Sequence, residues 1–394
     1  MNATNLNFSR TEYQARITRT RAAMSQADLD LLIVSDPSNM AWLTGYDGWS
    51  FYVDQCVILA LEGDPLWYGR GIDVNGALRT VFMGPDSIVG YPDHLVHNPP
   101  LHAMAHLAEQ VLPERGWDAL RIGVEMDNFY YSARAHACLQ TGLPMATLSD
   151  ATGLVNWQRA IKSPREIEYM RIAAGIVEAT HRHIYECIEP GMRKNDLVAE
   201  IYSSSIRGTG GHGGDYAAIV PLLPSGADAS ACHLTWDDQS MRAGEGTFFE
   251  IAGCYKRYHC PLSRSIFLGK PPEKFLRVDA AIGAGMQAGL EAARPGHTCE
   301  DVAVAFFTEL KRHDFEKDNR TGYSIGLSYP PDWGERTMSF RLGDKTELMP
   351  GMTFHFMTGL WMEDWGIETT ESILITDTGV ETFCNYPRQL FIKD

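Results

Sequence analysis

The chain of 394 residues lacks several features that define specialised classes of protein. No apolar run approaches the roughly 18 residues of a membrane span. The polar start "MNATNLNFSRTEYQARITRTR" has no apolar core of the kind that a secretion signal needs, so we expect a cytoplasmic protein. Basic residues are outnumbered, with 34 Lys and Arg against 50 Asp and Glu. The net charge of -16 disfavours nucleic acids and anionic membranes as partners.

Cysteine pairs are missing as well. The eight cysteines are scattered and form no C-x-x-C pair, which argues against both a disulfide framework and a structural zinc site. What the chain does contain, 44% hydrophobic and 21% charged residues, is typical of an ordinary globular protein. Its length is sufficient for two domains.

Strand and helix patterns alternate over residues 1–158. Helical periodicity in "RTEYQARITRTRAAMSQADLD" is followed by the apolar strand "LLIVSD" and by two strands in "QCVILALEGDPLWYG". After another helical stretch comes the strand "RIGVEM". This alternation predicts a small α/β domain.

A long helix is expected to open the second domain, residues 159–394. Ser163 and Glu166 fit a capping box, and Pro164 takes the first helical position, where its missing N–H costs nothing. Further on, "EPGMRKNDLVAEI" and "RPGHTCEDVAVAF" repeat one pattern of helix end, Pro-Gly turn and new helix. We therefore predict a duplicated ααββ unit whose two copies form a cleft. The alternative is chance recurrence, because Pro-Gly is common between helices.

Several polar residues lie in strand-like stretches of this second domain. His233 lies in the apolar setting of "ACHLTW", and Glu250 lies within the apolar run "GTFFEI". A lone histidine on a strand is more often a structural residue, whereas a buried carboxylate is costly unless it is paired. Glu368 and Glu371 are an odd number of residues apart, so on one strand only one of them can face a cleft. Glu250 is therefore the strongest functional candidate.

These segments, taken in order, resemble the pita-bread family, which includes methionine aminopeptidase, aminopeptidase P, prolidase and creatinase. The resemblance covers essentially the whole chain. It implies an α+β architecture in which a smaller creatinase-type α/β domain precedes the duplicated pita-bread catalytic domain. The peptidases of this family hold two divalent metal ions with Asp, Asp, His, Glu and Glu. In this chain the five positions fall on Glu250, Pro261, Tyr323, Met357 and Thr370, or on Glu371 for the last if the register slips by one residue.

Such a residue set cannot build a dinuclear metal site. Proline and methionine supply no hard oxygen ligand, and tyrosine is a poor replacement for imidazole. Creatinase also lacks the metals, and it hydrolyses a small amino acid that carries a guanidinium group. The resemblance therefore implies a metal-free, creatinase-type hydrolase of C–N bonds in a small amidine or guanidine, with no cofactor.

The resemblance also implies roles for single residues. His233 matches a substrate-contacting histidine of the family and is expected to act as base and then acid, or as a nucleophile. Glu250 and Glu371 are expected to bind the substrate's cationic group where relatives hold metals. Arg341 is expected to bind a substrate carboxylate, because a guanidinium group suits bidentate contacts. Substrate contacts are also expected from Thr370 and Tyr323.

Aromatic residues in "GYDGWSFYVDQ" are expected to complete the site of a partner subunit. In creatinase an aromatic side chain from the partner's N-terminal domain closes the site, so the resemblance implies a homodimer in which Trp49, Phe51 or Tyr52 does so and stacks on the cation. The alternative is that these three side chains fill the hydrophobic core and that Arg341 is a solvated surface residue.

Three other functions remain open on the sequence alone. One is creatinase itself or another metal-free amidine or guanidine hydrolase. The second, of a different class, is a non-catalytic pita-bread module that binds a peptide or protein. The third is a metal-dependent aminopeptidase P or prolidase with unusual ligands.

Overall fold

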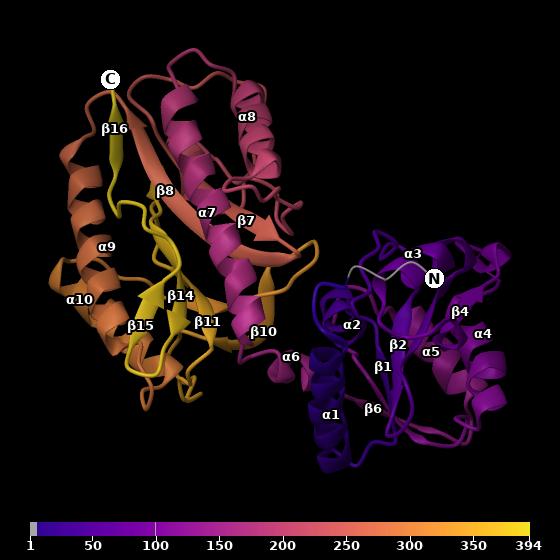
Figure 1. The fold of residues 1–394 in the computed structure, drawn as a ribbon. Helices are drawn as coiled ribbons and strands as arrows, with labels where there is room; N and C mark the ends of the chain where they lie inside the picture. Colours follow the sequence, from indigo (N-terminus) through magenta and orange to yellow (C-terminus); the bar gives the residue numbers. More distant parts are fainter. Residues whose placement is uncertain (1–5, 99) are drawn as a thin grey trace. The chain divides into compact units, whose positions relative to one another are not determined.

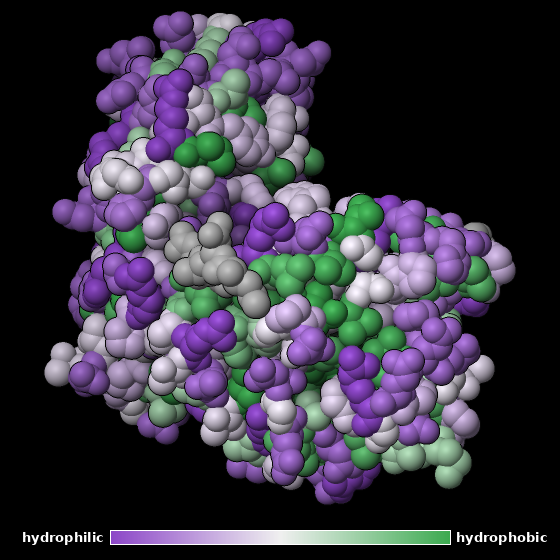
Figure 2. Space-filling view, turned by 45° about the vertical axis from the view of Figure 1, so that its right-hand side comes forward, coloured by the Kyte–Doolittle hydropathy of each residue, from purple (hydrophilic) through white to green (hydrophobic). Residues whose placement is uncertain are grey.

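The computed structural model describes residues 6–98 and 100–394. The chain divides into two compact units, Met1–Arg159 and Ala160–Asp394. No helix within the described residues is long and apolar enough to cross a membrane. Hydrophilic residues cover much of the face drawn in Figure 2, in keeping with the net charge of -16.

The first unit is built on one mixed six-stranded sheet in the order β4-β3-β2-β1-β5-β6. Strand β1 lies in the centre, antiparallel to β2 and parallel to β5. The predicted alternation of strand and helix is present. The elements are α1 (Arg10–Gln26), β1 (Leu31–Val34), α2 (Pro37–Thr44), β2 (Cys56–Ala60), β3 (Leu66–Arg70), α3 (Val74–Thr80), β4 (Ile88–Tyr91), α4 (Ala103–His106), β5 (Arg121–Val124), α5 (Ala133–Gly142), β6 (Thr147–Asp150) and α6 (Leu154–Gln158).

The second unit runs twice through two helices followed by strands. The first pass is α7 (Pro164–Cys187), α8 (Lys194–Arg207), β7 (Gly246–Tyr255) and β8 (Tyr258–Leu268). The second pass is α9 (Glu273–Ala292), α10 (Cys299–Arg312), β9 (Gly322–Ile325), β10 (Gly334–Ser339), β11 (Thr353–Met357), β12 (Leu360–Trp361), β13 (Gly366–Ile367), β14 (Thr370–Ile375), β15 (Val380–Thr382) and β16 (Phe391–Lys393).

Local sequence signals set the starts and ends of these helices. At the start of α7, the Ser163 side chain accepts from the backbone N–H of Glu166 and the Glu166 side chain accepts from that of Ser163, as the capping box predicts. Gly191 and Gly296, in the two Pro-Gly turns, have φ of 93° and 83°. A side chain would be strained there, so glycine is needed at both turns. The predicted repeat is thus built from two equivalent helix–turn–helix passages.

Strands β7 and β8 form a long antiparallel hairpin that lies beside α7 (Figure 1). In its register Glu250 is paired with Ser263, so both side chains lie on one face of the hairpin. The same face meets β14: the backbone N–H of Ser263 donates to the Thr370 hydroxyl at 2.7 Å, and the Ser372 hydroxyl donates to the carbonyl oxygen of Pro261 at 2.7 Å. These bonds join the two halves of the repeat where Glu250 lies.

Candidate active site

Glu250 is a buried carboxylate in the middle of β7, as the sequence predicts. Burial, followed by the charge of Asp332, raises the pKa of Glu250 to about 7. The nearest imidazole is that of His355, whose Nδ1 lies 4.0 Å from Glu250 Oε1. A carboxyl group with a pKa near neutrality can gain or lose a proton under ordinary conditions, which makes it suited to acid–base work or to binding a cation.

Tyr323, His355 and Trp333 form a hydrogen-bonded chain beside Glu250. The Trp333 Nε1–H donates to the Tyr323 hydroxyl at 2.8 Å, and that hydroxyl lies 3.0 Å from His355 Nδ1. Because indole nitrogen is only a donor, the simplest arrangement has the Tyr323 O–H donating to His355. Burial lowers the pKa of His355 to about 3, so this imidazole is neutral.

A second buried carboxylate, Glu368, lies near the first. It lies in the two-residue link between β13 and β14, and its side chain is fully buried. Burial, and then the charge of Glu250, raises the pKa of Glu368 well above its usual range, while Lys317 opposes the shift. Burial also lowers the pKa of Lys317 to about 8. Its Nζ lies 4.4 Å from the centre of the Trp361 ring. A cationic side chain therefore already lies over an aromatic ring in this region.

Unsatisfied polar atoms gather around the two carboxylates. Among the described residues, His355 Nε2 has no hydrogen-bond partner, and neither carboxylate oxygen of Glu368 has a hydrogen bond of good geometry, although the Ser263 hydroxyl lies close enough to oppose the rise in the pKa of Glu368. Buried polar groups are nearly always hydrogen-bonded, and exceptions call for an explanation. A small polar ligand whose N–H groups meet Glu368 and Glu250 supplies one. These atoms therefore define the candidate active site.

Thr370 and Glu371 lie on opposite sides of β14. The Thr370 hydroxyl faces Ser263 on the Glu250 side. Glu371 Oε1 instead accepts from Arg264 Nη2 at 2.5 Å and from Arg388 Nε at 3.1 Å. The prediction that Glu371 joins Glu250 is therefore wrong, because Glu371 is held in a buried ion pair away from Glu250. The sequence allowed only one of Glu368 and Glu371 to face the cleft, and in the structure Glu368 is the one near Glu250.

The five positions that hold metals in related peptidases do not fit a metal here. Pro261 offers only a backbone carbonyl, which accepts from Ser372, and Met357 offers only a thioether. The Tyr323 and Thr370 hydroxyls are engaged with neighbouring protein groups. Glu250 is the one remaining hard anionic ligand at these five positions, which is too few for two divalent ions.

His233 is not on a strand in an apolar setting, so that expectation is wrong. It lies exposed in a turn after the short helical turn Gly226–Ser230. Its neighbour Cys232 is half-buried, and burial, followed by the charges of Glu368 and Glu250, raises the pKa of that thiol. The loop therefore passes close to both carboxylates, and the imidazole next to Cys232 is open to solvent.

Arg341 is exposed in the turn after β10, and the described part of the chain gives its guanidinium group no hydrogen bond or ion pair. The structure thus does not bring it to Glu250. The cation it places there instead is Arg320, whose guanidinium carbon lies 4.4 Å from the centre of the Tyr323 ring. Arg320 and Lys317 lie in the irregular segment after α10, where the sequence carries no periodic signal that could have revealed them.

The three aromatic candidates lie in the first unit. Trp49 and Tyr52 are 58% and 59% exposed, so they do not fill its core. The rings of Trp49 and Phe51 are 4.8 Å apart, and Phe51 also meets Tyr130. These residues present an aromatic surface to solvent in a single chain.

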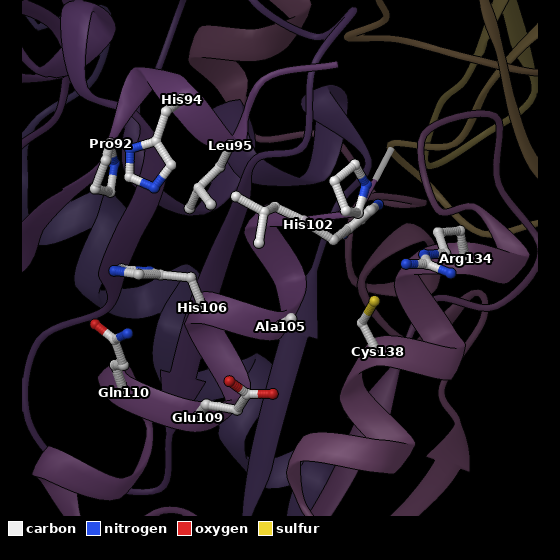
Figure 3. Close-up of a pocket in the computed structure, with 12 residues that line it drawn as sticks. Pro92, His94, Leu95, His102, Ala105, His106, Glu109, Gln110, Arg134 and Cys138 are labelled. Atoms are coloured by element: carbon white, nitrogen blue, oxygen red, sulfur yellow. The ribbon is translucent and has the colours of Figure 1, made fainter. Parts of the chain in front are cut away.

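A separate pocket of about 450 Å³ also lies in the first unit (Figure 3). Its polar lining includes His94, His102, His106 and Arg134, carried by the segment before α4, by α4 itself and by α5. It contains none of the residues expected to bind substrate. Two of its side chains are already engaged, because His106 Nδ1 lies 3.0 Å from the Tyr68 hydroxyl and His102 Nδ1 accepts a backbone N–H.

The comparisons with known proteins agree with this architecture. The model of metallopeptidase family M24 matches residues 168–377, and that of the creatinase/prolidase N-terminal domain matches residues 16–161. The chain belongs to family M24 and has the pita-bread fold behind a creatinase-type N-terminal domain. The family and fold that the motifs predict are thus confirmed.

Two curated relatives and one solved structure are similar to this chain over nearly its whole length. The chain is 58% identical to the ectoine hydrolase of Halomonas elongata over 98% of this chain and 99% of that protein. It is 23% identical to a creatinase from a Bacillus species, over 96% and 92%. The solved structure of prolidase from Thermococcus sibiricus superimposes with a TM-score of 0.83 at 19% identity, over 96% of this chain and 99% of that one. At that identity the likeness shows the fold alone.

Proposed function

We propose that this protein is an ectoine hydrolase that opens the cyclic amidine ring of ectoine without a metal ion. The observation that carries the proposal is a pair of buried carboxylates, Glu250 and Glu368, in a pita-bread site whose other metal positions have lost their ligands. The 58% identity to an ectoine hydrolase over nearly the whole chain supports it. So do "GYDGWSFYVDQ" and the block from "ACHLTW" to "PLSRS", which by themselves resemble ectoine hydrolases.

The cationic end of the substrate fits the two carboxylates. Ectoine is a zwitterion with a carboxylate and a protonated amidine whose charge is spread over two nitrogens. Each amidinium N–H can donate to one carboxylate, and charge-assisted hydrogen bonds of this kind are about twice as strong as neutral ones. The bound cation also favours the ionised forms of Glu250 and Glu368, and so offsets the burial that raises their pKa values.

The reaction needs one addition and one cleavage. Water adds to the amidine carbon and forms a C–O bond, and a proton leaves the water. A ring C–N bond then breaks, its electron pair stays on nitrogen, and a proton is delivered to that nitrogen. The product is N-acetylated L-2,4-diaminobutyrate. We assign both proton transfers to His233, with direct attack by His233 as the alternative. The assignment is supported by its neighbour Cys232, because burial and then the charges of Glu368 and Glu250 raise the pKa of that thiol.

The carboxylate end of the substrate needs a cation to bind it, and the site needs side chains that close it from solvent. Arg320, above the Tyr323 ring, is placed to receive the carboxylate. Trp49 and Tyr52 are exposed in a single chain and Phe51 is half-buried, which supports a homodimer in which they close the partner's site. Hydroxyectoine, which shares the ring, is a further candidate substrate. Because the product keeps an acetyl group, the reaction calls for a deacetylase as the next enzyme.

A product assay tests the substrate. The purified protein is incubated separately with ectoine, creatine and a proline dipeptide, and the products are identified by mass spectrometry. We expect N-acetylated diaminobutyrate from ectoine alone. Turnover of creatine or of the dipeptide with ectoine left intact would reject the proposal, and binding without turnover of any of the three would favour the non-catalytic module.

The His233→Ala variant tests the catalytic assignment. Loss of a general acid–base group lowers the rate by about two to four orders of magnitude. Because His233 is exposed, its removal leaves the packed core of the fold untouched. Leu234→Ala, which removes an exposed apolar neighbour, is the matched control. An activity of His233→Ala equal to that of the control would remove His233 from the mechanism.

A further inference from the structure

Three metal-ligand side chains meet on the outer helices of the second unit. His183 and Cys187 are one turn apart on α7, and Glu200 lies on α8, the helix beside it (Figure 1). One ligand atom from each lies within 4.8 Å of the others. All three side chains are half-buried, so the cluster is open to ions from solvent. None of the three belongs to the five metal positions of the related peptidases.

The spacing of the ligand atoms is close to that of a tetrahedral zinc site. With Zn–N of about 2.1 Å and Zn–S of about 2.3 Å, tetrahedral angles place nitrogen and sulfur roughly 3.6 Å apart and nitrogen and oxygen roughly 3.3 Å apart. In this chain Cys187 Sγ lies 3.5 Å from His183 Nε2 and 3.7 Å from His183 Nδ1, and Nε2 lies 2.9 Å from Glu200 Oε2. The sulfur therefore lies over the imidazole ring, and metal binding needs the ring to turn so that Nε2 points between the sulfur and the carboxylate. The distance between Nε2 and Oε2 is that of a hydrogen bond, and it needs to lengthen only slightly when a metal ion replaces the shared proton.

The surroundings also suit a metal. Glu186 Oε2 lies 3.9 Å from His183 Nδ1, on the nitrogen that faces away from Glu200, where zinc-bound histidines commonly meet a carboxylate. Imidazole, thiolate and carboxylate together are a borderline-soft set that suits zinc and the neighbouring transition metals rather than Mg²⁺ or Ca²⁺. These three ligands form no C-x-x-C pair, because only one is a cysteine and the third comes from another helix.

We propose that His183, Cys187 and Glu200 bind a single zinc-type divalent ion, with water as the fourth ligand, and that this ion clamps α7 to α8. The clamp is separate from catalysis, since the active site is built by strands and loops elsewhere in the unit. The expected consequence is a protein whose stability, rather than its chemistry, responds to zinc.

Cobalt and zinc titrations test the site. The chelator-treated full chain is titrated with Co²⁺ and followed by absorption spectroscopy, and its thermal unfolding is measured with and without Zn²⁺. We expect one Co²⁺ per chain with the near-ultraviolet charge-transfer band of a cobalt–thiolate bond, and a Tm that rises with the Zn²⁺ concentration, as binding to the folded state requires.

Matched variants identify the ligands. Cys187→Ser should remove the charge-transfer band and the rise in Tm, whereas Cys138→Ser, at another half-buried cysteine, should keep both. Glu186→Gln should weaken Co²⁺ binding by about tenfold or more, as the loss of a carboxylate behind a bound histidine does. Glu250→Gln should leave the band unchanged, since it alters the active site alone. No band in the wild-type chain, or a band that survives in Cys187→Ser, would overturn the proposal.

Discussion

The buried charge of Glu250 lowers the stability of the fold but favours the binding of a cation. Its pKa is raised from 4.5 to about 7 by burial, and then by Asp332, so the folded chain holds this proton more tightly than the unfolded chain does. Stability is therefore highest below the unfolded pKa and falls as the pH rises from about 4.5 towards 7. A cationic substrate removes the conflict because it pairs with the ionised carboxylate. The unfavourable burial of Glu250 is thus what a site for an organic cation requires.

This conflict predicts that Glu250→Gln stabilises the protein at alkaline pH. Neutral glutamine has no buried charge, so we expect the variant at about pH 8 to gain roughly 1 to 3 kcal/mol in its free energy of unfolding. The gain should disappear below about pH 4.5, where the wild-type carboxyl group is protonated in both states. Urea unfolding at the two pH values measures it, and a variant less stable than wild type at both would show that Glu250 is held by a partner.

The same carboxyl group predicts the pH dependence of catalysis. Because the ionised form binds the amidinium group, kcat/KM for ectoine should rise with pH through about 7, the pKa of Glu250 in the free enzyme. Glu250→Gln should lower kcat/KM by about two orders of magnitude or more and remove this rise. A wild-type profile that falls over the same range would contradict the role of Glu250 as a cation ligand.

The alternation of side chains along β14 separates a structural carboxylate from the functional ones. Glu371 is fully buried and paired with Arg264, whose Nη1 donates to the carbonyls of both Ser263 and Thr370. This network joins β14 to β8. Removing one partner of such a buried pair leaves the other charge uncompensated.

Glu371→Gln is therefore expected to destabilise the fold while sparing the chemistry. We expect a loss of about 3 kcal/mol in the free energy of unfolding, with kcat of the folded fraction close to wild type. Glu381→Gln, in an exposed pair with Arg171, is the control and should cost less than about 1 kcal/mol. Denaturant unfolding and ectoine turnover measure both variants. A stable Glu371→Gln protein with abolished turnover would return Glu371 to the substrate site.

Some elements of the fold and site could be predicted from the sequence, and others could not. The cap at Ser163, the two Pro-Gly turns and the buried strand around Glu250 follow from local patterns, so they could be predicted. Glu368 could not, because the argument placed it on one strand with Glu371, whereas it lies in the link before β14. Lys317 and Arg320 reach the site from an irregular segment, and only the folded chain brings such a segment to a distant strand.

The proposed homodimer makes each active site depend on two chains. If Trp49 acts in the partner's site, Trp49→Ala and Glu250→Gln chains are each impaired, but a mixed dimer contains one site with both native residues. Random exchange of subunits should then restore activity to about a quarter of the wild-type sites. The mixture is assayed after subunit exchange, with each variant alone as the control. No recovery in a mixture that has exchanged would place Trp49 in its own chain's site or outside any site.

In the proposed mechanism, two carboxylates and an organic cation replace the metals of the family. The most direct measurement is the kcat/KM for ectoine of protein stripped by a chelator, with its metal content determined, before and after addition of Mn²⁺ or Zn²⁺. We expect unchanged kcat/KM in the stripped protein, whether or not the helix cluster of His183, Cys187 and Glu200 is reloaded. Activity that is lost with the chelator and restored by Mn²⁺ would contradict it.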